Sequence, residues 1–142
     1  MNTNKPITAL AFDFGTRSIG VAFGQSLTGS ARELQPLAAK DGTPDWEAVQ
    51  KLIREWQPQR LLVGLPLNMD GSESEFGNRA RKFGQRLHGR TGLPVDYVDE
   101  RLSTRAAKQE AFERGHKGNY ARDPVDSIAA RIILEDWLRA RS

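Results

Sequence analysis

Three acidic sites in this sequence stand where elements of secondary structure are expected to begin or end. Asp13 closes an apolar run, residues 7–14, that otherwise has the character of a buried strand. Asp99 and Glu100 directly follow another strand-like run, and Asp126 lies in the first turn of an apolar helix. Carboxylates that converge on one edge of a sheet repel each other unless a divalent cation lies between them. The pattern therefore points to oxygen-ligand metal chemistry, such as the activation of water for phosphodiester hydrolysis.

Each of these sites also has an interpretation that is purely structural. Asp13 could accept hydrogen bonds from turn amides at residues 15–17, because Gly15 follows it at once. Asp99 and Glu100 could cap a helix that starts after them, and for this pair the capping and catalytic interpretations stay equally open. The expected convergence of all three sites is what favours chemistry.

Two carboxylates stand near the start of the last predicted helix. Asp123 precedes Pro124, and an acidic N-cap followed by proline is a common helix start, so we favour capping for Asp123. Asp126 shares a helical face with Ile133 and Trp137, and this apolar face should lie on the sheet. Asp126 should therefore point inward at one end of the helix, which favours a functional role.

The succession of strand-like and helix-like segments predicts how these carboxylates are positioned. A strand, helix, strand order implies a right-handed parallel crossover, which brings the carboxyl ends of parallel strands to one edge. We expect an α/β fold with a five-stranded mixed sheet, in which a three-strand antiparallel meander joins two parallel strands and helices flank the sheet. The expected strands are residues 7–14, 19–25, about 31–39, 60–65 and 95–98, and the later helices are about 73–90, 104–114 and from near Pro124.

The first helix has a start signal of its own. Thr43 suits the N-cap and Pro44 suits the first helical position. Trp46, Val49 and Trp56 follow at helical spacing. We therefore expect this helix to open at Thr43.

Composition narrows the possible chemistry. The 142 residues are enough for one domain, residues 1–142, with a real core. There are no cysteines, which excludes disulfides, thiolate catalysis, zinc fingers and iron–sulfur clusters, and only two histidines, so magnesium or manganese remains. No apolar stretch approaches the roughly 18 residues that span a bilayer, and the N-terminus has no signal-peptide pattern, so we expect a cytoplasmic protein without a membrane partner. The net charge of +3 and the abundance of arginine favour a phosphate-bearing partner.

Four blocks of this sequence resemble the YqgF (RuvX) family, whose members are described as Holliday-junction resolvases and as pre-16S rRNA nucleases. The blocks are residues 11–22, 63–71, 99–104 and 125–130, with Ile133 and Leu134 beyond the last. They occur in this order and span nearly the whole chain. The resemblance implies a ribonuclease-H-like fold.

The resemblance also implies a site. Asp13, Glu100 and Asp126 would be the catalytic set and would bind one or two Mg²⁺ or Mn²⁺ ions. The loop that includes Gly64 and Asp70 would border them. Many members have a second basic residue where this chain has Ser18, which leaves Arg17 as the candidate for phosphate contact in the first turn.

Basic residues surround the predicted acidic site. Arg79, Lys82 and Arg86 recur at helical spacing along one predicted helix, and Arg101 and Arg105 follow Glu100. Such residues often form only a solvated helix face. A nuclease needs a positive surface, however, because its acidic site repels the substrate backbone. The expected nucleic-acid-binding set is Arg17, Arg79, Lys82, Arg86, Arg101 and Arg105.

The function that we expect is metal-dependent hydrolysis of phosphodiester bonds, with processing of pre-16S ribosomal RNA in ribosome biogenesis as the family's suggestion. Cleavage of branched DNA at Holliday junctions is one alternative, and a non-catalytic RNA-binding ribosome-assembly factor is another. A nucleotide-binding phosphotransferase is disfavoured, because the sugar kinases and actin-like ATPases that share the Asp13–Thr16 pattern clamp their nucleotide between two such domains. The expected partners are structured RNA, branched DNA or a ribosomal precursor particle, bound by a monomer or a homodimer.

Overall fold

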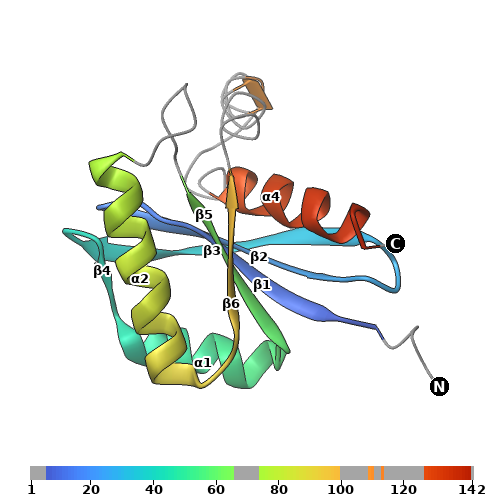
Figure 1. The fold of residues 1–142 in the computed structure, drawn as a ribbon, viewed down its shortest axis with the longest axis horizontal. Coiled ribbons are helices and arrows are strands. Elements are labelled where there is room, and N and C mark those ends of the chain that lie inside the picture. Colours follow the sequence, from blue (N-terminus) through green and yellow to red (C-terminus); the bar gives the residue numbers. More distant parts are fainter. Residues whose placement is uncertain (1–5, 66–73, 100–108, 111–112, 114–126, 142) are drawn as a thin grey trace.

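The computed structural model describes residues 6–65, 74–99, 109–110, 113 and 127–141. Six strands form one sheet in the order β4-β3-β2-β1-β5-β6. Helices α1 and α2 pack on one face and α4 packs on the other (Figure 1). The elements are β1 (Thr8–Asp13), β2 (Ser18–Gln25), β3 (Ser30–Lys40), β4 (Thr43–Pro44), α1 (Trp46–Trp56), β5 (Arg60–Leu65), α2 (Glu75–Thr91), β6 (Val95–Asp99) and α4 (Ile128–Arg139).

The predicted mixed sheet is confirmed. Strands β1, β2 and β3 are antiparallel neighbours, whereas β1, β5 and β6 run parallel. The carboxyl ends of β1, β5 and β6 therefore lie at one edge of the sheet. Because helices cover both faces, β1 and β5 are buried on both sides, which explains why their sequences are continuously apolar.

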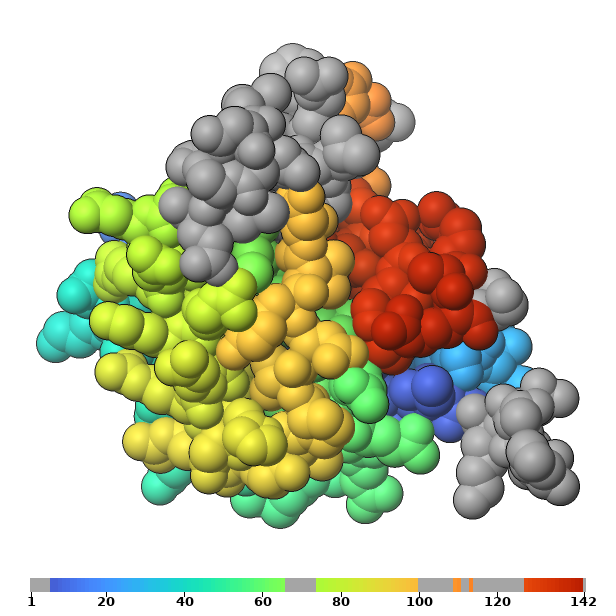
Figure 2. Space-filling model, in the orientation of Figure 1, coloured from blue at the N-terminus to red at the C-terminus, as the bar shows by residue number. Residues whose placement is uncertain are grey.

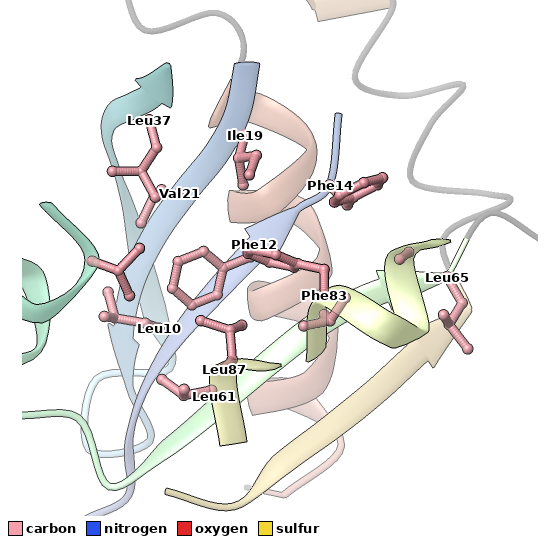
Figure 3. Close-up of a cluster of buried hydrophobic side chains, with 13 residues drawn as sticks. Leu10, Phe12, Phe14, Ile19, Val21, Leu37, Leu61, Leu65, Phe83 and Leu87 are labelled. Carbon is pink, nitrogen blue, oxygen red and sulfur yellow. The ribbon is translucent and has the colours of Figure 1, made fainter. Parts of the chain in front are cut away.

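The two faces of the sheet carry different cores. On the α1 and α2 side, large side chains such as Phe12, Phe83 and Leu87 fill the space between sheet and helix (Figure 3). On the α4 side, the sheet offers small residues, Ala9, Ala11 and Ala22, against which Leu134, Trp137 and Leu138 pack. Small side chains let α4 lie close to the sheet, so the end of β1 is near this helix.

The predicted start of the first helix is wrong. Thr43 and Pro44 form β4, a sixth strand that pairs with the end of β3, and the strand count is six instead of five. The N-cap of α1 is Asp45, whose Oδ1 accepts a hydrogen bond from the Glu47 amide at 3.0 Å. Proline has no amide hydrogen to donate, which a strand at the edge of a sheet tolerates.

The ladder between β2 and β3 contains a bulge. Val21 is paired with Leu34, but Ile19 is paired with Leu37, so β3 has one residue more than β2 in this stretch. Pro36 lies within the extra stretch, where a residue that cannot donate to the ladder is tolerated. The bulge leaves a local irregularity near the end of the sheet that carries Asp13.

Two predictions about helices fall mostly outside the described residues. Of the helix expected at about 104–114, the structure describes only residues 109–110 and 113, which are helical. The start expected near Pro124 also lies outside, and α4 is described from Ile128 onward. Within the part of the chain that the structure describes, no helix is long and apolar enough to cross a membrane.

Candidate functional site

Asp13 is the last residue of β1 and lies opposite Gly20 of β2. Side chains alternate along a strand, so Asp13 shares its face with Ala9 and Ala11, which belong to the core under α4. It is half-buried. The structure therefore puts one carboxylate at the carboxyl edge of the parallel strands, as the sequence predicted, and it shows that this carboxylate is on the α4 face.

The turn that follows Asp13 is tight. A Cβ atom at Gly15 would collide with the carbonyl oxygen of Ser18, so glycine is required there. The turn is held by backbone hydrogen bonds of 2.9 Å from the Gly42 amide to the Thr16 carbonyl and from the Ala39 amide to the Arg17 carbonyl. Arg17 itself is exposed on this turn, beside the connection from β3 to β4.

Ser127 fixes the start of α4 near Asp13. Its side chain is fully buried, and its Oγ accepts a hydrogen bond from the Val21 amide at 2.9 Å and donates one to the Leu34 carbonyl at 2.6 Å. Val21 and Leu34 are register partners beside the bulge, so the hydroxyl bridges two strands at a break in their ladder. Val21 also follows Gly20, the partner of Asp13. Sequence reasoning missed this residue, although a small polar side chain before an apolar helix is a signal of a helix start.

Asp99 does not join Asp13 on the same face. It is the last residue of β6, paired with Leu65 of β5, and it is exposed. Val95 and Tyr97 pack on the α2 side, and alternation puts Asp99 on that side too. Since β5 separates β1 from β6, the two backbones are about 10 Å apart, twice the usual strand spacing.

The other predicted acidic residues lie outside the described residues; these are Glu100, Asp123 and Asp126. Within the ranges that the structure does describe, no group of three or more His, Cys, Asp or Glu could hold a metal ion. Of the expected set, the structure therefore gives the position of Asp13 alone.

Three basic residues of α2, Arg79, Lys82 and Arg86, line a pocket. A pocket of about 300 Å³ lies between α2 and the turn from β3 to β4. Nη2 of Arg79 donates to the carbonyl oxygen of Asp41 at 2.9 Å and to its Oδ1 at 3.0 Å. Arg101 and Arg105 of the predicted binding set lie outside the described residues. The pocket is lined by Phe14, Asp41, Gly42, Thr43, Arg79, Lys82, Phe83 and Arg86.

Two other arginines of α2 lie over aromatic rings instead. The guanidinium of Arg90 is 4.5 Å from the ring centre of Trp46, and that of Arg81 is 4.7 Å from the ring centre of Tyr97. Burial raises the pKa of the Tyr97 hydroxyl above its usual value, and the positive charge of Arg81 partly offsets this rise. These arginines therefore support packing between α2 and its neighbours.

Arg131 of α4 ties together three acidic side chains. Its Nε lies 3.0 Å from Oε2 of Glu33 in β3, and its Nη2 lies 2.5 Å from Oε1 of Glu110. Among the residues that the structure describes, the Nε atom has no well-aligned hydrogen-bond acceptor, so its own contact with Glu33 is an ion pair. Glu135, one turn further along α4, is within 4.0 Å. Through these ion pairs, Glu110 is attached to α4 and to the sheet. Glu110 lies in the segment that follows Glu100, a predicted site residue.

The chain matches known proteins over almost all of its length. The RuvX family model, described as "Holliday junction resolvase", matches residues 7–140. A protein of Saccharophagus degradans named "Putative pre-16S rRNA nuclease" is 61% identical over 132 residues, which are 93% of each chain. A protein of the same name from Pseudomonas aeruginosa is 56% identical over 139 residues, which are 97% of this chain and 96% of the relative.

Several solved structures of similar fold are resolvases. RuvC of T. thermophilus in complex with a Holliday junction substrate has a TM-score of 0.57 and 17% identity, over 95% of this chain and 96% of that one. The Fowlpox virus resolvase in complex with Holliday junction DNA has a TM-score of 0.55 and 10% identity, over 94% and 98%. At such identities the likeness concerns the fold alone, and it agrees with the ribonuclease-H-like architecture expected from the sequence.

Proposed function

Because this chain belongs to the RuvX family, we propose that it is a divalent-metal-dependent endonuclease and that its substrate is the precursor of 16S ribosomal RNA. The names of relatives at 56–61% identity support the substrate. The observation that carries the activity is the position of Asp13. It is a half-buried carboxylate at the carboxyl edge of a ribonuclease-H-like sheet, on the face where α4 begins.

The proposed catalytic and metal-binding residues are Asp13, Glu100 and Asp126. Glu100 follows Asp99, which ends the parallel strand β6. Asp126 precedes Ser127, whose hydroxyl is anchored to the strand that pairs with β1. The donors are all carboxylate oxygens, which suits a hard cation such as Mg²⁺ or Mn²⁺. The same proposal takes residues 1–142 as one domain that acts in the cytoplasm.

In the proposed reaction, a water oxygen forms a bond to phosphorus while the bond from phosphorus to the leaving oxygen breaks. A divalent ion, when bound, supplies Lewis acidity and lowers the pKa of water. The carboxyl group of Asp13 is held at a fixed point of the sheet edge, because the Gly15 turn and the pairing with β2 leave its backbone little freedom. This rigidity supports a defined cleavage position.

The substrate backbone is held by positive side chains. The proposed set is Arg17, Arg79, Lys82, Arg86, Arg101 and Arg105. Arg17 lies on the turn after Asp13, and three others gather at the pocket beside α2. Contacts of this kind give affinity without sequence preference, so recognition of a particular RNA comes from its shape.

Branched DNA is the second candidate substrate. The description of the family model and the junction-bound resolvases of similar fold favour it. A Holliday junction has two strands to cut, so a homodimer would suit this activity, whereas a monomer would suffice for RNA processing.

The test is cleavage of end-labelled pre-16S RNA and of a four-way DNA junction, each with Mg²⁺, Mn²⁺ or EDTA. Asp13→Asn should lower cleavage by at least about 100-fold, the scale for losing one group that stabilises transition-state charge. The matched control is Asp96→Asn, which removes a carboxylate that pairs with Arg60 at 2.9 Å, near the other end of β6. Equal activity of the wild type and Asp13→Asn would refute the site. Tight RNA binding with no cleavage under any metal would indicate an assembly factor instead.

A further inference from the structure

The pocket beside α2 has the chemistry of a site for one phosphate group. We infer that it binds a single backbone phosphate of the nucleic-acid strand, next to the linkage that is cut at Asp13, and so sets the cleavage position. This inference rests on the proposed nuclease function and specifies how its substrate is held. α2 lies on the surface that Figure 2 presents, in yellow-green.

The pocket exists because of the backbone at Gly42. This residue has a φ of +83°, and a Cβ there would lie 2.8 Å from Cζ of Phe14 and 3.2 Å from Nη2 of Arg79. A larger residue would therefore push against the floor and one wall of the hollow. Asp41, also at positive φ, turns its carbonyl and its carboxylate towards the same arginine.

The charge of the pocket is positive. Arg79, Lys82 and Arg86 line it from successive turns of α2, and among the described lining residues the one carboxylate is that of Asp41. Arg79 is occupied by Asp41, whereas Lys82 and Arg86 have no carboxylate within ion-pair distance among the residues that the structure describes. An ammonium group and a guanidinium fork beside one hollow suit the oxygens of a phosphate.

The walls accept a phosphate and leave no place for a base. The aromatic residues of the floor, Phe14 and Phe83, are only 6% and 3% exposed, so they offer no ring face for stacking. The base of a free nucleotide would find no ring to stack on at this floor. A polymer backbone needs no such contact, because the rest of the strand lies elsewhere on the protein.

The pocket is close to the proposed site of cleavage. Phe14 follows Asp13 directly, and the Gly42 amide is bonded to the turn that follows them. Asp13 is on the α4 face and the pocket is on the α2 face of the same sheet edge. A strand that passes over this edge places one phosphate in the pocket and a neighbouring linkage at Asp13.

The first experiment measures binding of a short single-stranded RNA of precursor sequence in EDTA, where no cleavage occurs. The slope of log K against log salt is negative, and its magnitude should decrease by up to about 0.7 for Lys82→Gln and for Arg86→Gln, because about 0.7 is the loss expected for one phosphate contact on a single strand. The matched controls are Lys51→Gln and Arg54→Gln on the exposed side of α1, and their slopes should stay unchanged. Pocket variants that behave like these controls would overturn the proposal.

The second experiment replaces one phosphate at a time by a neutral methylphosphonate. One position should weaken binding to the wild type several-fold but have no effect on binding to Lys82→Gln, and that position should lie at a constant distance from the mapped cut. Absence of any coupled position would overturn the proposal. If the RNA displaces inorganic phosphate from the pocket but no methylphosphonate position couples to Lys82, the proposal is also overturned. The pocket would then bind a free anion and not a phosphate of the strand.

The outcome is separable from that of the proposed function. If the wild type never cleaves but one phosphate couples to Lys82, the pocket stands as a strand-binding site and the nuclease assignment fails. If the wild type cleaves and no position couples to Lys82, the nuclease assignment stands and the pocket is refuted.

Discussion

The hydroxyl of Ser127 takes the place of a direct hydrogen bond between β2 and β3. Both of its partners are backbone groups beside the bulge, and the side chain has no exposed surface. No side-chain capping bond is made to α4, although Ser127 occupies the N-cap position. The residue therefore joins the helix to the sheet at the point where the ladder is interrupted.

Ser127→Ala should lower the free energy of unfolding by about 2 kcal/mol or more, because the Val21 amide and the Leu34 carbonyl would both lose a buried partner. Denaturant unfolding measures this loss. Ser26→Ala is the control, since Ser26 Oγ accepts from the Ile7 amide at 2.8 Å in a half-buried place that water can reach. That variant should lose about 1 kcal/mol or less. Equal losses in the two variants would contradict the role given to Ser127.

The candidate site was predictable only where its signal is local. Asp13 ends a continuous apolar run, and nothing but the run itself is needed to place it at a strand end. The orientation of Asp99 depends on where β6 ends, and a strand predicted to stop at residue 98 leaves the face of Asp99 undefined. Ser127 had a local signal as a helix start, but its bridging contacts had none, because its partners are 106 and 93 residues away in sequence.

At the scale of elements, the start of α1 shows how two helix signals compete. Thr43 followed by Pro44 and Asp45 followed by Trp46 are both plausible starts. The structure uses Asp45, since Thr43 and Pro44 pair with the end of β3. A two-residue strand has no periodicity, so β4 was not predictable from the pattern of the sequence.

Variants at these two positions distinguish the caps. Asp45→Ala should lower the free energy of unfolding by about 1 kcal/mol, because the Glu47 amide loses its acceptor. Thr43→Ala should change it by no more than about 0.5 kcal/mol, because the side chain is exposed. Asp45→Asn keeps an acceptor and should stay close to the wild type. Thermal unfolding compares the stabilities of the three variants. A larger loss of stability for Thr43→Ala than for Asp45→Ala would favour Thr43 as the N-cap, as predicted from the sequence.

The remaining elements were predictable because their local signals are clear, which are continuous apolar runs for β1 and β5 and a helical period for α2. The strands β1, β2, β5 and β6 and the helix α2 each lie within two residues of the ranges expected from sequence. The order of these elements then restricts the topology, because a crossover between parallel strands is right-handed. The bulge at Pro36 was not predictable from these signals, because register depends on the partner strand as well as on the strand itself.

At the scale of the whole molecule, the side-chain hydroxyl of Tyr97 makes the free energy of unfolding depend on pH. Burial raises the pKa of Tyr97 in the folded protein above the usual 10.0. The unfolded chain therefore releases this proton at a lower pH than the folded chain does, and the free energy of unfolding should fall as the pH rises above about 10. Below that pH the contribution is complete and constant.

Denaturant unfolding on both sides of this pH tests the coupling. Tyr97→Phe loses the hydrogen bond of 3.2 Å to the Arg81 carbonyl at every pH, but it should lack the alkaline decline that Tyr97 causes. The stability difference between wild type and variant should therefore shrink as the pH rises. A difference that stays constant across the range would show that Tyr97 is not responsible.

The two cores on opposite faces of the sheet also divide the tryptophans. Trp46 and Trp56 pack with the α1 and α2 layer, and Trp137 packs with the α4 layer, where the Arg141 guanidinium lies 3.8 Å from its ring centre. Each layer therefore contains its own tryptophan fluorescence, and the six-stranded sheet lies between the two layers. Emission from Trp137 reports on the helix whose start is anchored beside Asp13, while emission from the other two reports on the layer that holds the phosphate pocket. Variants that keep the tryptophans of one layer only can in this way distinguish substrate that arrives at one face from rearrangement at the other, without any attached dye.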